Sequence, residues 1–85
     1  MVEKKVTVQR QDGLDAAMIA VLVQHACKYE SKIYLESEDK KVNAKSIMGM
    51  MNIGVCRGGE VTIYADGSDE ADALKEIEDY LVSGS

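Results

Sequence analysis

The feature that most constrains the fold is the alternation of two hydrophobic periods within only 85 residues. Apolar residues at every second position predict a strand with one buried face, whereas spacings of i, i+3, i+4 and i+7 predict an amphipathic helix. Along this chain the two patterns follow the order β-α-β-β-α-β-α. We therefore expect a single domain over residues 1–85, of the α+β class. Its predicted architecture is an open-faced sandwich, with a four-stranded antiparallel sheet covered on one face by three helices.

Four segments carry the strand pattern, and they cover residues 2–9, 31–37, 40–43 and 60–65. The polar Glu38-Asp39 pair separates the second from the third, which predicts a hairpin. The residues expected to face the core are Val6, Val8, Ile33, Leu35, Val61, Ile63 and Ala65. Each strand is therefore predicted to bury one face and expose the other.

Two segments carry a long helical pattern, one over residues 16–29 and one that follows Asp69 and ends before Ser83. Asp15 precedes the first of them and is placed as its N-cap, where a carboxylate also meets the positive end of the helix dipole. The predicted core-facing residues are Ile19, Leu22, Val23 and Ala26 in the first helix and Ala73, Leu74, Ile77, Tyr80 and Leu81 in the second.

A third, methionine-rich helical segment begins after Ser46 and is expected to end near Gly54. A serine before an apolar run is a good N-cap, because its hydroxyl accepts a hydrogen bond from a free backbone N–H. The apolar side chains do not form one stripe: Ile47, Met48 and Met51 gather on one side, and Met50 and Ile53 point to another. Either the helix is buried all round, or one side is an adaptable surface for a partner.

The chain is acidic, with a formal net charge of −5, which disfavours nonspecific binding to nucleic acid. The acidic excess lies mainly in the last third. Basic residues cluster around Ser46 instead, and they are Lys40, Lys41, Lys45 and Arg57. A locally basic surface on an acidic protein favours an anion or an acidic partner at this place.

The two cysteines, Cys27 and Cys56, lie far apart and match no C-x-x-C spacing. With no signal peptide before them, we expect reduced thiols and a cytoplasmic protein. His25 is the only histidine and is expected at the surface rather than in a metal site. No apolar run reaches the length of a membrane span, and we find no hydrolytic triad, Walker loop or metal cluster. We expect neither an enzyme nor a bound cofactor or metal.

Three runs of residues resemble the HPr family of bacterial phosphocarrier proteins, and most of all its regulators of catabolite repression. They are Val21-Leu22-Val23-Gln24, the long run Lys41-Val42-Asn43-Ala44-Lys45-Ser46-Ile47-Met48-Gly49, and Asp69-Glu70 with Ala73-Leu74. Together with the element order, the resemblance extends over nearly the whole chain and implies an HPr-like fold.

The carrier motif of that family is degenerate in this chain. The family pattern is Gly, an aliphatic residue, His, Ala, Arg and usually Pro, whereas the run here is Gly13-Leu14-Asp15-Ala16-Ala17-Met18. Asp15 replaces the phosphoryl-accepting histidine, and Ala17 replaces the arginine that balances its charge. Even the regulatory relatives, which usually have glutamine in place of the histidine, keep that arginine. A carrier role is therefore disfavoured.

Three readings of Asp15 remain. In the first, which is our default, Asp15 is only a helix cap. In the second it accepts a phosphoryl group and forms an acyl phosphate. In the third its charge partly imitates that of phosphohistidine. The imitation is partial because a carboxylate carries roughly half the charge of a phosphate.

The resemblance implies that Ser46 is phosphorylated from ATP by HPr kinase/phosphorylase. It further implies that the phosphoserine form is a corepressor for catabolite control protein A, a LacI-type repressor. On this hypothesis Ile47, Met48 and Met51 point outward as partner-binding anchors, and Met50 and Ile53 face the core. The alternatives are a phosphotransferase carrier that uses Asp15 and an HPr-like binding module with another partner. The protein is expected to be a monomer or a weak homodimer, since the first strand is a candidate sheet edge.

Overall fold

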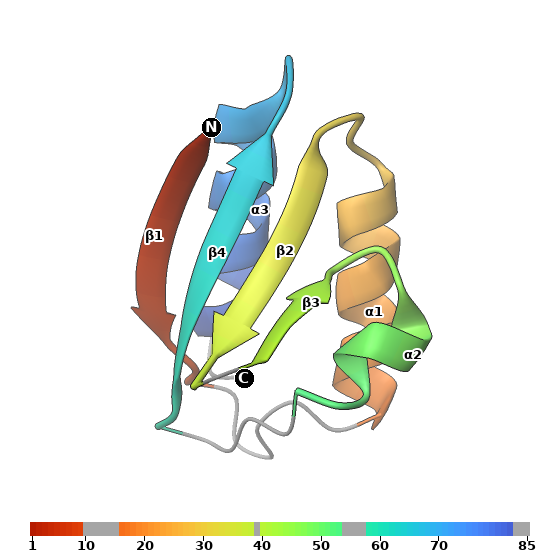
Figure 1. The fold of residues 1–85 in the computed structure, drawn as a ribbon, viewed down its shortest axis with the longest axis vertical. Helices are drawn as coiled ribbons and strands as arrows, with labels where there is room; N and C mark the ends of the chain where they lie inside the picture. Colours follow the sequence, from red (N-terminus) through yellow and green to blue (C-terminus); the bar gives the residue numbers. More distant parts are fainter. Residues whose placement is uncertain (10–15, 39, 54–57, 83–85) are drawn as a thin grey trace.

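Four antiparallel strands form one sheet in the order β1-β4-β2-β3 (Figure 1). The structure is a computed structural model and describes residues 1–9, 16–38, 40–53 and 58–82. The strands are β1 (Val2–Thr7), β2 (Lys32–Ser37), β3 (Lys40–Asn43) and β4 (Glu60–Asp66). β2 and β3 pair as the predicted hairpin, with Ser37 opposite Lys40. β1 lies at one edge of the sheet, as the sequence indicated.

The strand register explains why one face of the sheet is buried. β4 pairs with both β1 and β2, so that Val61 lies opposite Val6 and Ile63 opposite Leu35. Because side chains alternate between the two faces of a sheet, this register places the apolar side chains of neighbouring strands on the same face. All seven inward residues predicted from the sequence are at most 6% exposed: Val6, Val8, Ile33, Leu35, Val61, Ile63 and Ala65.

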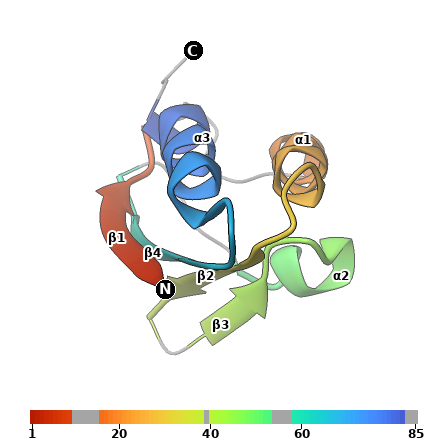
Figure 2. The same cartoon turned by 90° about the horizontal axis from the view of Figure 1, so that it is seen from above.

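Two long helices cover that face, and Figure 2 shows them side by side above the sheet. They are α1 (Ala16–Cys27) and α3 (Glu70–Val82). The predicted stripe of α1 is buried throughout, and in α3 Leu74 and Tyr80 are only partly buried while the rest of its stripe is buried. The open-faced sandwich is thus confirmed. α1 ends earlier than expected, because Lys28 and Tyr29 donate their N–H groups three residues back, to His25 and Ala26.

The methionine-rich helix is shorter than the sequence predicted. α2 covers only Ile47–Met50, one turn beside α1 at the β3 edge, and does not extend toward Gly54. The Asn52 side chain donates to the Met48 carbonyl oxygen at 3.2 Å, which offers the backbone an alternative to further helix. The N–H groups of Asn52 and Ile53 then donate to the carbonyl oxygens three residues back, so α2 is followed by turns with the tighter 3₁₀-type hydrogen bonding. Residues 54–57 lie outside the described part of the chain.

A partly buried polar junction, which the sequence did not reveal, joins the start of β2 to the start of α3. The Asp69 carboxylate accepts hydrogen bonds from the N–H of Glu30 at 2.9 Å, the N–H of Ser31 at 3.0 Å and the Ser31 hydroxyl. Ser31 is completely buried. These bonds, that of the Ser31 hydroxyl first, lower the pKa of Asp69. Gly67 packs directly on Ser31, in a space that admits no side chain.

Candidate functional site

The Ser46 hydroxyl is the N-cap of α2, as predicted. After β3, the Asn43 side-chain oxygen accepts the N–H of Lys45 at 2.8 Å, and the Asn43 carbonyl accepts the N–H of Ser46 at 3.0 Å. This turn leaves Ser46 in an extended conformation, with φ −112° and ψ 115°. Its Oγ then accepts the N–H of Gly49 at 3.2 Å. One free donor of the first turn is thereby satisfied, and the hydroxyl lies at the start of the helix.

Beside this hydroxyl is a patch of exposed apolar side chains, which we call the methionine patch: Ile47, Met48 and Met51. They are 52%, 83% and 51% exposed, respectively. On the opposite side of the turn, Met50 is 0% and Ile53 5% exposed, so the expected division between outward and core-facing residues is confirmed. The use of the patch by a partner stays a prediction.

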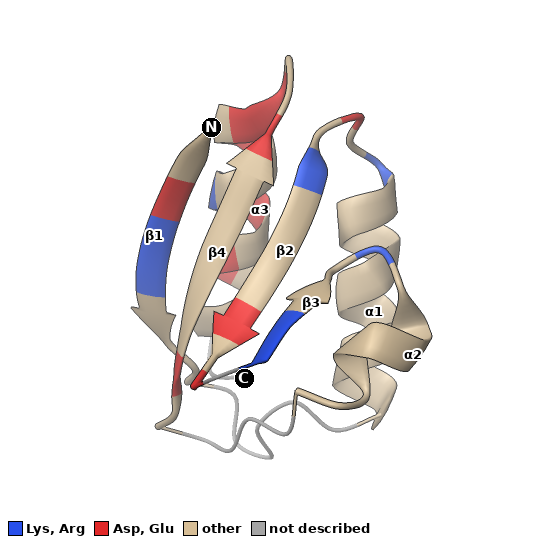
Figure 3. Ribbon diagram, viewed as in Figure 1, with Lys and Arg blue, Asp and Glu red and all other residues tan. Residues whose placement is uncertain are grey.

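Two lysines near Ser46 are used within the protein. Lys40 Nζ donates to the Asn52 carbonyl oxygen at 3.1 Å, and Lys45 Nζ donates to the Tyr29 carbonyl oxygen at 2.6 Å. Figure 3 shows basic residues on β3 and on the segment that leads from it to α2. Arg57, the fourth member of the predicted basic cluster, lies outside the described residues.

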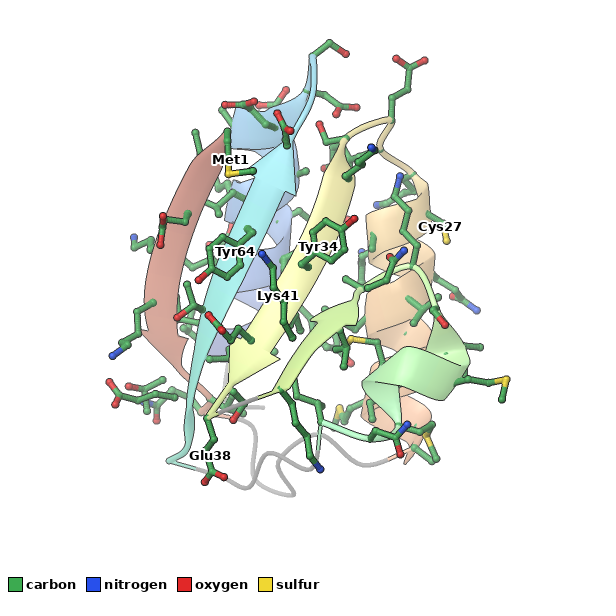
Figure 4. All side chains as sticks on the ribbon, viewed as in Figure 1. Met1, Cys27, Tyr34, Glu38, Lys41 and Tyr64 are labelled. Atoms are coloured by element: carbon green, nitrogen blue, oxygen red, sulfur yellow. The ribbon has the colours of Figure 1, made fainter. Side chains whose placement is uncertain are left out.

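Lys41 does not belong to this neighbourhood, and its inclusion in the cluster was wrong. Strand alternation sends it to the open face of the sheet, where its Nζ lies 4.2 Å from the ring centroid of Tyr64 and 5.3 Å from that of Tyr34 (Figure 4). The Tyr64 hydroxyl donates to Glu36 at 2.6 Å, and this bond raises the pKa of Tyr64 to about 12. The ammonium is therefore held over two rings, away from Ser46.

The degenerate carrier position is only partly within the described residues. Asp15 lies outside them, so its predicted capping role is untested. Ala17 is exposed in the first turn of α1, and α1 contacts α2. A methyl group there supplies no positive charge for a phosphoryl group.

A polar cluster links α1 to α3, and no pattern in the sequence predicted it. Glu76 accepts from His25 Nδ1 at 2.6 Å, from Lys28 Nζ at 2.7 Å and from the Tyr29 hydroxyl at 2.8 Å. His25 is partly exposed at the surface, as expected, but it also packs against the Tyr80 ring, a contact that the sequence did not indicate. No local pattern could reveal these contacts, because Glu76 is 51 residues from His25 along the chain.

Glu76→Gln is expected to flatten the acid dependence of stability. The bond from Lys28, followed by those from Tyr29 and His25, lowers the pKa of Glu76 to about 2. A carboxylate with a depressed folded-state pKa stabilises the protein above its ordinary pKa, and that contribution disappears as the pH falls from about 4.5 toward 2. The urea midpoint of the parent should therefore fall more steeply between pH 5 and pH 2.5 than that of the variant.

Asp79→Asn is the matched control, since it removes an exposed carboxylate from the same helix. It should leave the pH profile parallel to that of the parent. Equal slopes for the parent and Glu76→Gln would contradict the role given to Glu76.

Within the described residues there is no group of three or more histidine, cysteine or acidic side chains placed to hold a metal ion. None of the helices in that part of the chain is long and apolar enough to span a membrane. Cys27 is exposed and unpaired, whereas Cys56 lies outside the described residues.

Comparison with known proteins points to one family. A family model described as "PTS HPr component phosphorylation site" matches residues 2–83. The chain is 47% identical over 81 residues to the HPr-like protein Crh of Bacillus subtilis (strain 168), which covers 95% of both proteins.

Two solved structures have the same fold. The HPr-C-His protein of Thermoanaerobacter tengcongensis superposes with a TM-score of 0.93 at 43% identity, covering 99% of this chain and 94% of the other. A crystal structure of selenomethionyl Crh from Bacillus subtilis gives a TM-score of 0.78 at 45% identity, covering 99% and 97%. The latter is described as an intertwined dimer with a swapped domain.

Proposed function

Because the chain belongs to the HPr family of the phosphotransferase system, we propose that it is a regulator of carbon catabolite repression switched at Ser46. The members of this family are phosphocarrier and regulatory proteins rather than enzymes. HPr kinase/phosphorylase transfers the γ-phosphate of ATP to the Ser46 hydroxyl. The phosphoserine form then binds catabolite control protein A as its corepressor. The observation that carries the proposal is the capping hydroxyl of Ser46 immediately beside the exposed methionine patch.

The patch and the serine act together in this proposal. Phosphorylation replaces a neutral hydroxyl by a group with a charge of about −1.5 to −2 and three strong acceptor oxygens. A basic partner site makes charge-assisted hydrogen bonds to the phosphate and not to the hydroxyl, while the methionine patch supplies apolar contact area. The neighbouring turn is already held by its own hydrogen bonds, so the modification changes what the surface binds and need not refold the domain.

A carrier function through Asp15 finds no support among the described residues, because exposed Ala17 brings no cation to that end of α1. Such a carrier would incorporate phosphate from phosphoenolpyruvate through the general phosphotransferase enzyme. The label would be hydroxylamine-sensitive and absent from Asp15→Asn.

Ser46→Ala is expected to abolish phosphorylation by HPr kinase/phosphorylase and ATP, whereas the parent gains one phosphate as measured by intact mass. Ser68→Ala is the control, because it removes another serine hydroxyl from an exposed position and should be phosphorylated like the parent. Loss of the cap should cost only about 1 kcal/mol, so circular dichroism should find Ser46→Ala folded. Phosphate on Ser46→Ala, or none on the parent, would refute the proposal.

We further infer that two copies of this chain associate weakly through β1. β1 is an edge strand, and such an edge leaves backbone N–H and C=O groups free to pair with another chain. Sedimentation velocity over a concentration series should show a mass that rises with concentration. A constant monomer mass at millimolar concentration would exclude the homodimer.

A further inference from the structure

We propose that Lys45 is a positioning residue for the reaction at Ser46, because its ammonium group ties the serine-bearing turn to the C-terminal end of α1. This inference rests on the proposed phosphorylation of Ser46. It goes further in assigning a role to a side chain that does not itself react, and in connecting Ser46 to a helix distant in the sequence.

The Ser46 turn is short. α2 has only four residues, and isolated helices of that length are unstable in water. Within the turn, Ser46 is held by short-range bonds to Asn43 on one side and to Gly49 on the other. Those bonds set the shape of the turn. Its place on the side of the sheet is set by Ala44, whose N–H donates to the Ile33 carbonyl oxygen at 2.8 Å, and by the buried Met50.

Lys45 adds a link to the end of α1. Its Nζ donates to the Tyr29 carbonyl oxygen at 2.6 Å, across 16 residues of sequence. Tyr29 lies two residues beyond Cys27, the last residue of α1, and therefore close to the negative end of the helix dipole. A cation is favoured there, and a charge-assisted bond of this length is stronger than one between neutral groups.

The carbonyl that receives Lys45 is itself held in place. The Tyr29 N–H donates to the Ala26 carbonyl oxygen at 3.2 Å, and the Tyr29 hydroxyl donates to Glu76 of α3 at 2.8 Å. The tether therefore ends on a residue fixed by both long helices. Through Lys45 the Ser46 turn takes its position from the α1–α3 layer as well as from β3.

For phosphoryl transfer this matters because the rate depends on how well the attacking oxygen is placed before the reaction. A turn that shifts by an ångström presents the Ser46 hydroxyl poorly to ATP. Lys45 is engaged within the protein, so its loss should affect placement of the hydroxyl more than the encounter with the kinase. Placement acts on kcat, whereas attraction between exposed charges acts on association and weakens at high salt.

The first test uses the free protein and needs no kinase. Amide hydrogen exchange of Ser46 and Gly49, measured by NMR, should be about tenfold faster in Lys45→Met than in the parent. Lys45→Arg keeps a cation on a long side chain and should restore slow exchange. Lys41→Met is the charge-matched control, because its ammonium lies over Tyr34 and Tyr64 on the open face of the sheet. It should leave exchange unchanged.

The second test uses the kinase. With Lys45→Met, kcat should fall about tenfold, which corresponds to about 1.4 kcal/mol, with KM nearly unchanged and the loss persisting at high salt. Lys45→Arg should recover most of the rate, and Lys41→Met should match the parent. A loss confined to KM that disappears at high salt would instead make Lys45 a docking charge. Unchanged amide exchange in Lys45→Met would overturn the inference.

If the kinase leaves even the parent unmodified, the proposed function fails, and the exchange measurement still decides whether Lys45 holds the turn.

Discussion

Truncating Ile47 and Met48 together to alanine is expected to weaken binding of the phosphorylated protein to catabolite control protein A about 100-fold without unfolding it. Both side chains are more than half exposed, so the folded protein loses little packing. Large exposed apolar residues at the centre of an interface act as hot spots, and a 100-fold loss corresponds to about 2.7 kcal/mol. Calorimetric titration of the repressor with each phosphorylated variant measures the effect.

Val82→Ala is the matched control for that experiment. Val82 is 41% exposed and ends α3, which Figure 2 shows over the β1 side of the sheet, whereas α2 lies at the β3 edge. Its truncation should leave repressor affinity within twofold of the parent. If the double variant bound as tightly as the parent, the methionine patch would not be the partner surface and only the phosphate would be recognised.

Gly67→Ala should have the largest effect on stability. A Cβ at this position would lie 2.6 Å from Ser31 Oγ and 2.7 Å from Ser31 Cα. Because a Cα cannot rotate away as a side chain can, the junction between β2 and α3 must open. We expect a loss of about 3 kcal/mol in the free energy of unfolding, from overpacking together with the unfavourable φ of 158°. For a domain of this size that lowers the melting temperature by roughly 15 °C, measurable by calorimetry.

Gly58→Ala separates the two causes of that loss. Gly58 also has a positive φ, of 85°, but no atom lies within 4 Å of the Cβ that alanine would add. Its substitution should cost only about 1 kcal/mol, from backbone conformation alone. Similar losses for the two variants would show that the close approach to Ser31 contributes nothing.

The periodic part of the fold could be predicted from the sequence. Val61, Ile63 and Ala65 alternate with polar residues and are all buried in β4, as strand geometry requires. The ends of the segments were predicted less accurately. The Asn52 side chain donates a hydrogen bond to the Met48 carbonyl oxygen, and α2 ends after one turn. Such competition depends on one side chain and leaves no periodic signal.

The candidate site was predictable where a local pattern carried it. Ser46 as a cap and the exposure of Met48 follow from neighbouring residues. Long-range contacts were not predictable. The hydrogen bond from Lys45 to the Tyr29 carbonyl oxygen and the one that Glu76 accepts from His25 both depend on how the layers pack.

The most direct measurement is a titration of catabolite control protein A with this protein before and after stoichiometric phosphorylation of Ser46. The central claim predicts binding that is at least 100-fold tighter with the phosphate and that weakens as salt is raised, because charge-assisted bonds to the phosphate supply the difference. Ser46→Ala carried through the same reaction should bind as weakly as the unmodified protein. Equal affinity of the phosphorylated and unmodified forms would contradict the claim that Ser46 is the switch.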